Sequence, residues 1–210
     1  MPRLDLEKER ERLSVMRFYE RSYADRGLIA GIDEVGRGPL FGPVAAAAVI
    51  LDPDKEILYL NDSKKLSESR REALYDEIME KALAVGLAYV SAERIDQINI
   101  LQATFEAMRT AVSRLALQPD FLLVDAVTIP AISIPQLPII KGDAKSVSIA
   151  AASIVAKVSR DRLMKEYDRI YPGYGLLKNK GYGTAEHIEA LKRLGPTPLH
   201  RRSFIKNFTE

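Results

Sequence analysis

Apolar residues along the chain fall into short continuous runs and into longer stretches with helical spacing. A run of four to eight apolar residues bounded by turn residues is typical of a buried strand, whereas apolar residues three and four apart indicate a helix. Two strands close together in sequence, followed by alternating helices and strands, favour a mixed β-sheet flanked by helices. The predicted strands are residues 28–33, 44–51, 86–91, 121–127 and 139–140.

Boundary signals place helices between and after these strands. Ser69 and Glu72 have the spacing of a capping box, Thr184 is a potential N-cap, and Pro119 ends the apolar pattern that precedes it. Residues 4–25 alternate charged and apolar positions, which indicates an exposed helix packed lightly on the body. The other predicted helices are residues 69–84, 98–117, 146–171 and 184–194.

Composition is that of a globular protein with one sizeable core: 210 residues, 47% hydrophobic and 29% charged. The chain has no cysteine, which excludes disulfides, thiolate metal sites and cysteine nucleophiles. Its first residues are charged and form no secretory signal, and the apolar run 44–51 is far shorter than the roughly 20 residues of a membrane span. We therefore expect a cytoplasmic protein that does not enter a membrane.

Charge is distributed unevenly along the chain. Residues 28–156 contain 12 Lys and Arg against 17 Asp and Glu, whereas residues 157–210 contain 12 against 6. A basic tail beside an acidic centre suits a protein that binds a polyanion while holding cations in the middle. A solvated surface of mixed charge explains the same distribution equally well.

Acidic residues stand at three predicted strand ends: Asp33 with Glu34, Asp125, and Asp143. A buried carboxylate is costly unless a cation or hydrogen bonds compensate its charge. Each acid alone would usually be a loop cap or a surface charge, but four that converge would form an oxygen-only site for Mg²⁺ or Mn²⁺. Such a site favours two-metal phosphoryl transfer, in which no side-chain nucleophile is needed.

The chain has only two histidines, His187 and His200, which argues against a histidine-based zinc hydrolase or a Ser/His triad. Directly after the acid pair, Gly36, Arg37 and Gly38 could let the backbone approach a substrate and place a guanidinium on a phosphate. A tight turn between two strands is the alternative interpretation. The dinucleotide-binding motif is rejected because Pro39 breaks its pattern.

Other polar segments are candidate contacts to a nucleic acid. Residues 61–66 lie in a predicted loop and residues 145–148 at the start of a predicted helix, and both segments could bind phosphate. A third segment, residues 181–184, places a tyrosine among glycines, where its ring could lie against a sugar or base. The alternatives are a solvated loop and a tyrosine that packs on the core. The candidate residues are Lys64, Lys65, Lys145, Ser146, Ser148, Tyr182 and Thr184.

Taken in order, these motifs resemble bacterial ribonuclease HII, and together they cover nearly the whole chain. The resemblance implies a ribonuclease H-like mixed β-sheet flanked by helices, with a small C-terminal helical subdomain. We expect an N-terminal helical arm (1–27), a catalytic core (28–172) and a C-terminal helical substrate-binding part (173–210). The matching segments are Gly31–Gly38, Asn61–Leu66, Leu123–Ala126, Lys141–Ser146, Ala150–Ile154, Ala156–Asp161, Gly181–Thr184 and His200–Phe204.

By this resemblance the family's metal-site carboxylates fall on Asp33, Glu34, Asp125 and Asp143, its glycine-arginine-glycine motif on Gly36, Arg37 and Gly38, and its substrate tyrosine on Tyr182. The implied activity is hydrolysis of the RNA strand of RNA/DNA hybrids and cleavage 5′ of single ribonucleotides in duplex DNA, with Mn²⁺ or Mg²⁺. The products would carry 3′-OH and 5′-phosphate ends, and the process implied by the resemblance is ribonucleotide excision repair. The related type HIII enzymes carry an extra N-terminal domain, for which residues 1–27 are too short. We expect a monomer.

A 2′-OH is the group by which a protein distinguishes RNA from DNA at one site. Backbone groups around Gly36 and Gly38, with Tyr182 behind the sugar, could read it without contacting bases. Two rival interpretations remain: another metal-dependent nuclease or integrase of the same fold, and a non-catalytic nucleic-acid binder. The first would lack this glycine-arginine-glycine and tyrosine combination, and the second would not need Mg²⁺ or Mn²⁺.

Overall fold

The sheet at the centre of the molecule is mixed, as the sequence predicts. The computed structural model describes residues 3–209, and within them the sheet has the strand order β3-β2-β1-β4-β5. β1 pairs antiparallel with β2 and parallel with β4, so the sheet changes from antiparallel to parallel at β1. The strands are β1 (Ile29–Val35), β2 (Val44–Ile50), β3 (Ala84–Val90), β4 (Phe121–Asp125) and β5 (Gln136–Ile139).

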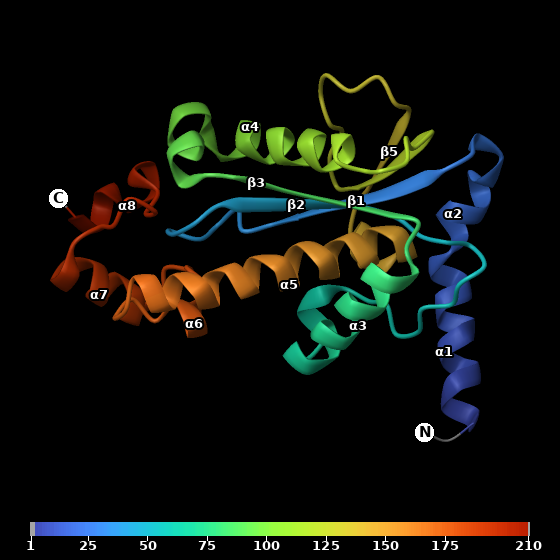
Figure 1. The fold of residues 1–210 in the computed structure, drawn as a ribbon, viewed down its shortest axis with the longest axis horizontal. Coiled ribbons are helices and arrows are strands. Elements are labelled where there is room, and N and C mark those ends of the chain that lie inside the picture. Colours follow the sequence, from blue (N-terminus) through green and yellow to red (C-terminus); the bar gives the residue numbers. More distant parts are fainter. Residues whose placement is uncertain (1–2, 210) are drawn as a thin grey trace.

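Helices cover both faces of this sheet (Figure 1). α4 (Ala92–Ser113) packs on one face, and α5 (Val147–Ile170) crosses the other, with α3 (Glu68–Lys81) beside it. At Gly31 the backbone of α5 lies directly on the strand, because a Cβ there would be 2.1 Å from the carbonyl carbon of Ser148. This close approach fixes α5 on the face of β1 that also carries Asp33.

The N-terminal arm differs from the single, lightly packed helix that the sequence predicts. It consists of α1 (Arg3–Met16), α2 (Phe18–Ser22) and a 3₁₀ helix η1 (Ala24–Arg26), with a break at Arg17. Leu13 and Met16 are buried in the same apolar cluster as residues of α3 and α5. The arm is therefore part of the packed body, because two of its apolar residues complete that cluster.

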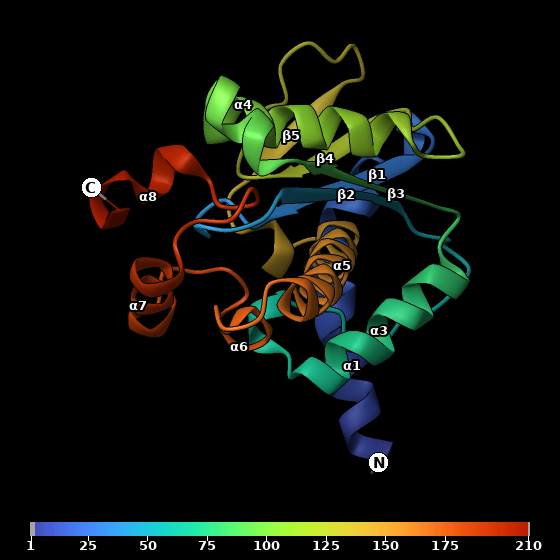
Figure 2. The ribbon, with the colours of Figure 1, turned by 60° about the vertical axis from the view of Figure 1, so that its left-hand side comes forward.

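The C-terminal helices lie at the end of the molecule opposite the arm (Figures 1 and 2). They are α6 (Leu176–Asn179), α7 (Ala185–Leu194) and α8 (Arg202–Thr209). Thr184 caps α7 by accepting a hydrogen bond from the N–H of His187, which confirms the predicted start of this helix. The sequence prediction missed α6, which is a single turn, and α8, whose first N–H groups are bound by the distant Asp96.

Several predicted boundaries were wrong for local reasons. Ser67, not Ser69, is the N-cap of α3, because its hydroxyl accepts from the N–H of Arg70. α4 begins at Ala92 and contains a kink at Asn99 (φ 66°, ψ 165°), so its first turn lacks the periodicity of the rest. β5 begins at Gln136 and includes Pro138, which an edge strand tolerates. Among residues 3–209, no helix combines the length and apolar character needed to cross a membrane.

Candidate active site

Asp33 and Asp125 are brought together by the pairing of β1 with β4. The two strands are parallel and Ile32 pairs with Val124, so the next residue on each strand is an aspartate at the same edge of the sheet. Asp33 is buried, with 6% of its surface exposed, and Asp125 is half-buried. Parallel pairing thus joins two acids that are 92 positions apart in the sequence.

Asp33 lies in a strongly destabilising environment for a negative charge. Burial raises its pKa well above the usual range, and the nearby charges of Glu34 and Asp125 raise it further. Hydrogen bonds from the Ser153 hydroxyl and from the N–H of Glu34, at 2.7 Å from Oδ1, oppose this effect only in part. A cation beside these acids would relieve the same repulsion.

Glu34 connects the acids to the loop that follows β1. Burial raises its pKa, Arg37 acts in the opposite direction, and Asp125 raises the pKa again. Nη1 of Arg37 lies 3.6 Å from Oε1 of Glu34. The glycine-arginine-glycine segment and the acid pair are thus in direct electrostatic contact.

The third and fourth acids are connected through the backbone of residue 142. The N–H of Gly142 donates to Oδ1 of Asp125 at 2.7 Å, and Gly142 begins the 3₁₀ helix η3 (Gly142–Ala144) that carries Asp143. Asp143 is buried, and its pKa is raised by burial and then by the charges of Asp62 and Asp125. All four predicted carboxylates therefore belong to one electrostatic cluster.

Asp62 is a fifth member of this cluster that the sequence reasoning missed. It stands in the Asn61–Leu66 segment, which was interpreted as a source of phosphate contacts, and it also caps the 3₁₀ helix η2 (Ser63–Lys65). Lys64 follows it, and the charges of Asp62, Asp143, Asp33 and Asp125 raise the pKa of Lys64 although its burial acts the other way. Lys64 is thus a local counter-charge for the acids, a role that its position before α3 did not indicate.

The described residues contain no group of three or more His, Cys, Asp or Glu side chains already arranged to hold a metal ion. Local hydrogen bonds explain this arrangement: Oδ1 of Asp33 and Oδ1 of Asp125 each accept a backbone N–H, and Glu34 is turned toward Arg37. The donor set still fits a divalent ion. It offers carboxylate oxygens alone, which hard cations prefer, and the pKa values of Asp33, Glu34 and Asp143 are raised by charges that such an ion would neutralise.

Gly36, Arg37 and Gly38 follow the acid pair in the chain, and Tyr182 lies against Gly38. Arg37 and Gly38 are exposed, and the Tyr182 side chain, with 42% of its surface exposed, lies against Gly38. A Cβ on Gly38 would be 3.6 Å from Cε1 of the tyrosine ring. The sequence left open whether Tyr182 packs on the core, and the structure leaves a large part of its ring facing solvent.

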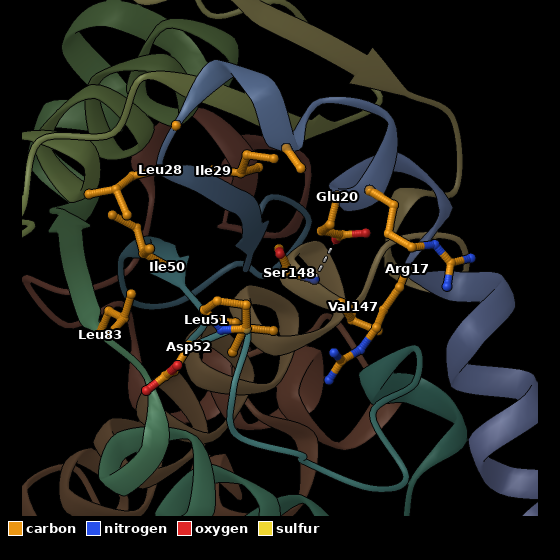
Figure 3. A pocket seen from close by; sticks show the side chains of 14 residues that line it. Arg17, Glu20, Leu28, Ile29, Ile50, Leu51, Asp52, Leu83, Val147 and Ser148 are labelled. Atoms are coloured by element: carbon orange, nitrogen blue, oxygen red, sulfur yellow. Dashed lines mark hydrogen bonds between the residues drawn. The ribbon is translucent and has the colours of Figure 1, made fainter.

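The remaining predicted contacts separate into two groups. Lys64, Lys65, Lys145 and Thr184 are exposed, although the Thr184 hydroxyl serves as a helix cap. Ser146 and Ser148 are buried, and both bond to Glu20 of the arm; Figure 3 shows the bond from Ser148. The Ser146 hydroxyl donates to Oε1 of Glu20 at 2.5 Å, and the Ser148 N–H donates to the same oxygen at 3.0 Å. In this conformation neither serine side chain faces solvent.

A cavity of about 280 Å³ lies beside Glu20, between the arm and the core (Figure 3). Apolar residues form most of its wall, and none of the four predicted acids lines it. The apolar residues in its wall include Leu28, Ile29, Ile50, Leu51, Leu83 and Val147. This cavity is therefore distinct from the acidic cluster.

A mixed sheet covered on both faces, with acids meeting where β1 and β4 end, defines a hydrolytic nuclease of the ribonuclease H type. The fold is similar to the crystal structure of ribonuclease H2 from Pyrococcus horikoshii OT3, with a TM-score of 0.72 and 27% identity over 86% of this chain and 96% of that chain. The profile of the Ribonuclease HII family matches residues 30–207, and the chain belongs to that family.

Curated bacterial relatives agree with this family. The chain is 67% identical to a ribonuclease HII from Lachnoclostridium phytofermentans, over 97% of this chain and 80% of the relative. It is 54% identical to a ribonuclease HII from Clostridioides difficile, again over 97% of this chain and 80% of the relative. Ribonucleases H act on RNA/DNA hybrids and depend on divalent metal ions.

Proposed function

We propose that this chain is an endoribonuclease that hydrolyses the RNA strand of RNA/DNA hybrids and cuts 5′ of single ribonucleotides embedded in duplex DNA. The products would carry 3′-OH and 5′-phosphate ends. The observation that carries the proposal is the contact between Gly38 and the exposed ring of Tyr182, in the loop whose Arg37 lies 3.6 Å from Glu34 of the acid pair. A sugar-recognition surface next to a carboxylate cluster suits an enzyme that selects one nucleotide by its ribose.

The residues that would hold the ions are Asp33, Glu34, Asp125 and Asp143. Two bound Mg²⁺ or Mn²⁺ ions would supply an activated water and stabilise the leaving oxygen. The protein keeps these four carboxylates close to one another through strand pairing and through the bond from Gly142 to Asp125. Lys64 offsets part of their charge, which helps the cluster fold before an ion is present.

The loop after β1 provides groups that can read a 2′-OH. The carbonyls of Gly36 and Arg37 are occupied by the guanidinium of Arg201, whereas no hydrogen bond among residues 3–209 engages the N–H groups of Arg37 and Gly38. These N–H groups can donate to a ribose oxygen, and the Tyr182 ring can lie behind the sugar. A deoxyribose has no 2′-oxygen to accept such a bond, so the contact would favour a ribonucleotide.

Contacts to the phosphate backbone would set the position of the duplex without reading base sequence. Lys64, Lys65 and Lys145 are exposed, stand close in sequence to Asp62 or Asp143, and suit this role; Lys64 also interacts with the acids in the structure. Ser146, Ser148 and Thr184 stay predicted contacts, the two buried serines only if their bonds to Glu20 open. The C-terminal part, residues 173–210, contributes Tyr182, and we expect a monomer to act in the cytoplasm during ribonucleotide excision repair.

The test uses a DNA duplex with one embedded ribonucleotide, incubated with the protein in the presence and absence of Mg²⁺ or Mn²⁺, with the cut position mapped. We expect one cut 5′ of the ribonucleotide that requires the ion, and no cut in an all-DNA duplex. Asp125→Asn should abolish this cut, and Asp54→Asn, at an exposed acid outside the cluster, is its matched control. Cleavage of all-DNA duplex at the same rate would contradict the proposed discrimination.

A further inference from the structure

Two arginines, Arg160 in α5 and Arg201 just before α8, are fully buried, with 0% of their surface exposed. Neither forms an ion pair with a carboxylate among residues 3–209. Burying an unpaired guanidinium is unfavourable unless every donor finds a good acceptor. The two side chains therefore need acceptors close by, and both find them in the same loop.

Arg201 binds three carbonyls of the segment that follows the acid pair. Its Nη2 donates to the carbonyl of Gly36 at 2.6 Å, its Nη1 to that of Arg37 at 2.8 Å, and its Nε to that of Gly42 at 2.9 Å. The planar guanidinium thus joins the two ends of a loop that turns between β1 and β2. Two of its three acceptors belong to the glycine-arginine-glycine motif.

Arg160 binds the other half of the same loop. Its Nη2 donates to the carbonyl of Phe41 at 3.1 Å and its Nε to that of Pro43 at 3.0 Å, while its Nη1 donates to the carbonyl of Lys180 at 2.9 Å. Lys180 immediately precedes the Gly181–Thr184 segment that carries Tyr182. Arg160 therefore connects the loop after β1 to the segment of the candidate substrate tyrosine.

Backbone hydrogen bonds place the loop between two C-terminal segments. The N–H of Leu40 donates to the carbonyl of Gly181, and the N–H of Arg201 donates to the carbonyl of Leu40, both at 2.8 Å. Gly36 has φ 89°, and a Cβ there would be 2.3 Å from Nε of Arg160, so the loop packs directly on this side chain. The loop has no helix or strand of its own between residues 36 and 43, so its shape depends on these partners.

We propose that Arg201 is a positioning residue for ribonucleotide recognition: it holds the carbonyls of Gly36 and Arg37 so that Gly38 stays against Tyr182 beside the acids. This inference rests on the proposed function, because it assigns Arg201 to the surface that would read the ribose. Arg201 does not touch the substrate in this account. Because Arg201 belongs to the His200–Phe204 motif, this motif would act by fixing the shape of the loop after β1.

A lysine cannot replace Arg201 in this role. Its ammonium is a point charge on a flexible stem and cannot match three carbonyls in one plane. Burial, with the charge of Arg160, lowers the pKa of Arg201 to about 9, and the same burial would also penalise the charge of a lysine. Arg201→Lys is therefore a conservative change that removes the geometry and spares most of the side-chain volume.

The test compares Arg201→Lys with the matched control Arg202→Lys, whose arginine is the exposed neighbour in the chain. Cleavage is measured on a duplex with one ribonucleotide and on an RNA/DNA hybrid, and amide hydrogen exchange is followed over residues 36–42. We expect kcat on the single-ribonucleotide duplex to fall about 10- to 100-fold, with KM nearly unchanged and a smaller loss on the hybrid. Exchange should accelerate in residues 36–42, and the control should match the wild type.

Equal rates for the two variants would overturn the inference while leaving the proposed function intact, whereas a wild type that does not cut the single-ribonucleotide duplex would overturn the proposed function itself. An equal loss on both substrates, with exchange faster throughout the protein, would show a general structural role and also overturn the inference. If Arg201→Lys does not fold, Asp96→Asn takes away one of the two carboxylate oxygens that accept the N–H groups of Arg202 and Ser203, and so loosens the segment that carries Arg201. The kcat of Asp96→Asn should then fall more on the single-ribonucleotide duplex than on the RNA/DNA hybrid, and wild-type rates on both substrates would overturn the inference.

Discussion

The ring of Tyr182 lies against Gly38, so that a Cβ on that glycine would be 3.6 Å from Cε1 of the ring. Tyr182 comes from the segment before α7 and Gly38 from the loop after β1, and the bond from Leu40 to the carbonyl of Gly181 keeps the two segments side by side. This contact is the structural basis for the proposed recognition of a ribose.

Removing the ring should therefore impair cleavage at a lone ribonucleotide. Stacking of a base or sugar on an aromatic ring contributes about 1–3 kcal/mol, so Tyr182→Ala should lower the rate on such a duplex by about 10- to 100-fold. Tyr182→Phe keeps the ring and is the matched control, with a rate close to the wild type. Single-turnover cleavage measures both, and a wild-type rate for Tyr182→Ala would contradict the role given to the ring.

Removing one carboxylate should abolish activity and stabilise the metal-free protein. Asp33→Asn takes away a buried charge whose pKa is raised by burial, Glu34 and Asp125, while Asp33 contributes nothing else that asparagine cannot replace. We expect no cleavage and a Tm increase of about 2–4 °C, the shift that about 1 kcal/mol produces in a domain of this size. Calorimetry in EDTA checks this, with Asp54→Asn as control, and a lower Tm for Asp33→Asn would contradict it.

Acid should destabilise the protein through His200. Burial, and then the charge of His187, lowers the pKa of His200 from 6.5 to about 4 in the folded state. The unfolded chain therefore binds the proton first, so stability is full above pH about 6.5 and is lost as the pH falls toward about 4. The loss from this group is about 3 kcal/mol.

Urea unfolding at pH 7 and pH 4.5 checks the contribution of His200. His187 acts in the same direction and Asp33 in the opposite one, so the wild type is compared with His200→Gln. The wild type should lose more stability between the two pH values than the variant does. An equal loss in both proteins would show that His200 does not carry this effect.

The start of α3 gives a purely local prediction. Ser67 accepts the N–H of Arg70, so Ser67→Ala should cost about 1 kcal/mol and lower the Tm by about 2–4 °C. Ser69→Ala removes a serine that lies inside the first turn and should have little effect on Tm. A larger decrease in Tm for Ser69→Ala than for Ser67→Ala would contradict this assignment and support the capping box of Ser69 and Glu72 that the sequence predicts.

The grouping of the four acids could be predicted from sequence because each stands at or shortly after the end of a predicted apolar strand, and a carboxylate in that position needs an explanation. The mixed sheet could be predicted because two apolar runs lie close together in the sequence before strands and helices begin to alternate. Asp62 was missed because it precedes two lysines in a polar loop, where a charge needs no explanation. Only the fold brings it next to Asp143.

Arg160 and Arg201 could not be predicted as buried, because arginine in a basic tail is usually exposed. Most of their acceptors are backbone carbonyls more than 100 positions away, which leave no mark on the sequence. Glu20 is similar: it lies in a charged helix, and its bonds to Ser146 and Ser148 join segments far apart in the chain. Hydrogen bonds between a side chain and the backbone of a distant segment therefore could not be predicted from the sequence and required the structure.

The central claim is that Asp33, Glu34, Asp125 and Asp143 together hold divalent ions against a bound duplex. It is tested most directly by the anomalous scattering of Mn²⁺ in crystals grown with a duplex that contains one ribonucleotide and an uncleavable bond. We expect Mn²⁺ peaks enclosed by these four side chains, with the carboxylates of Asp33 and Asp125 turned away from the backbone N–H groups that now donate to them. Ordered duplex with no peak there, or with Mn²⁺ bound only elsewhere, would contradict the account.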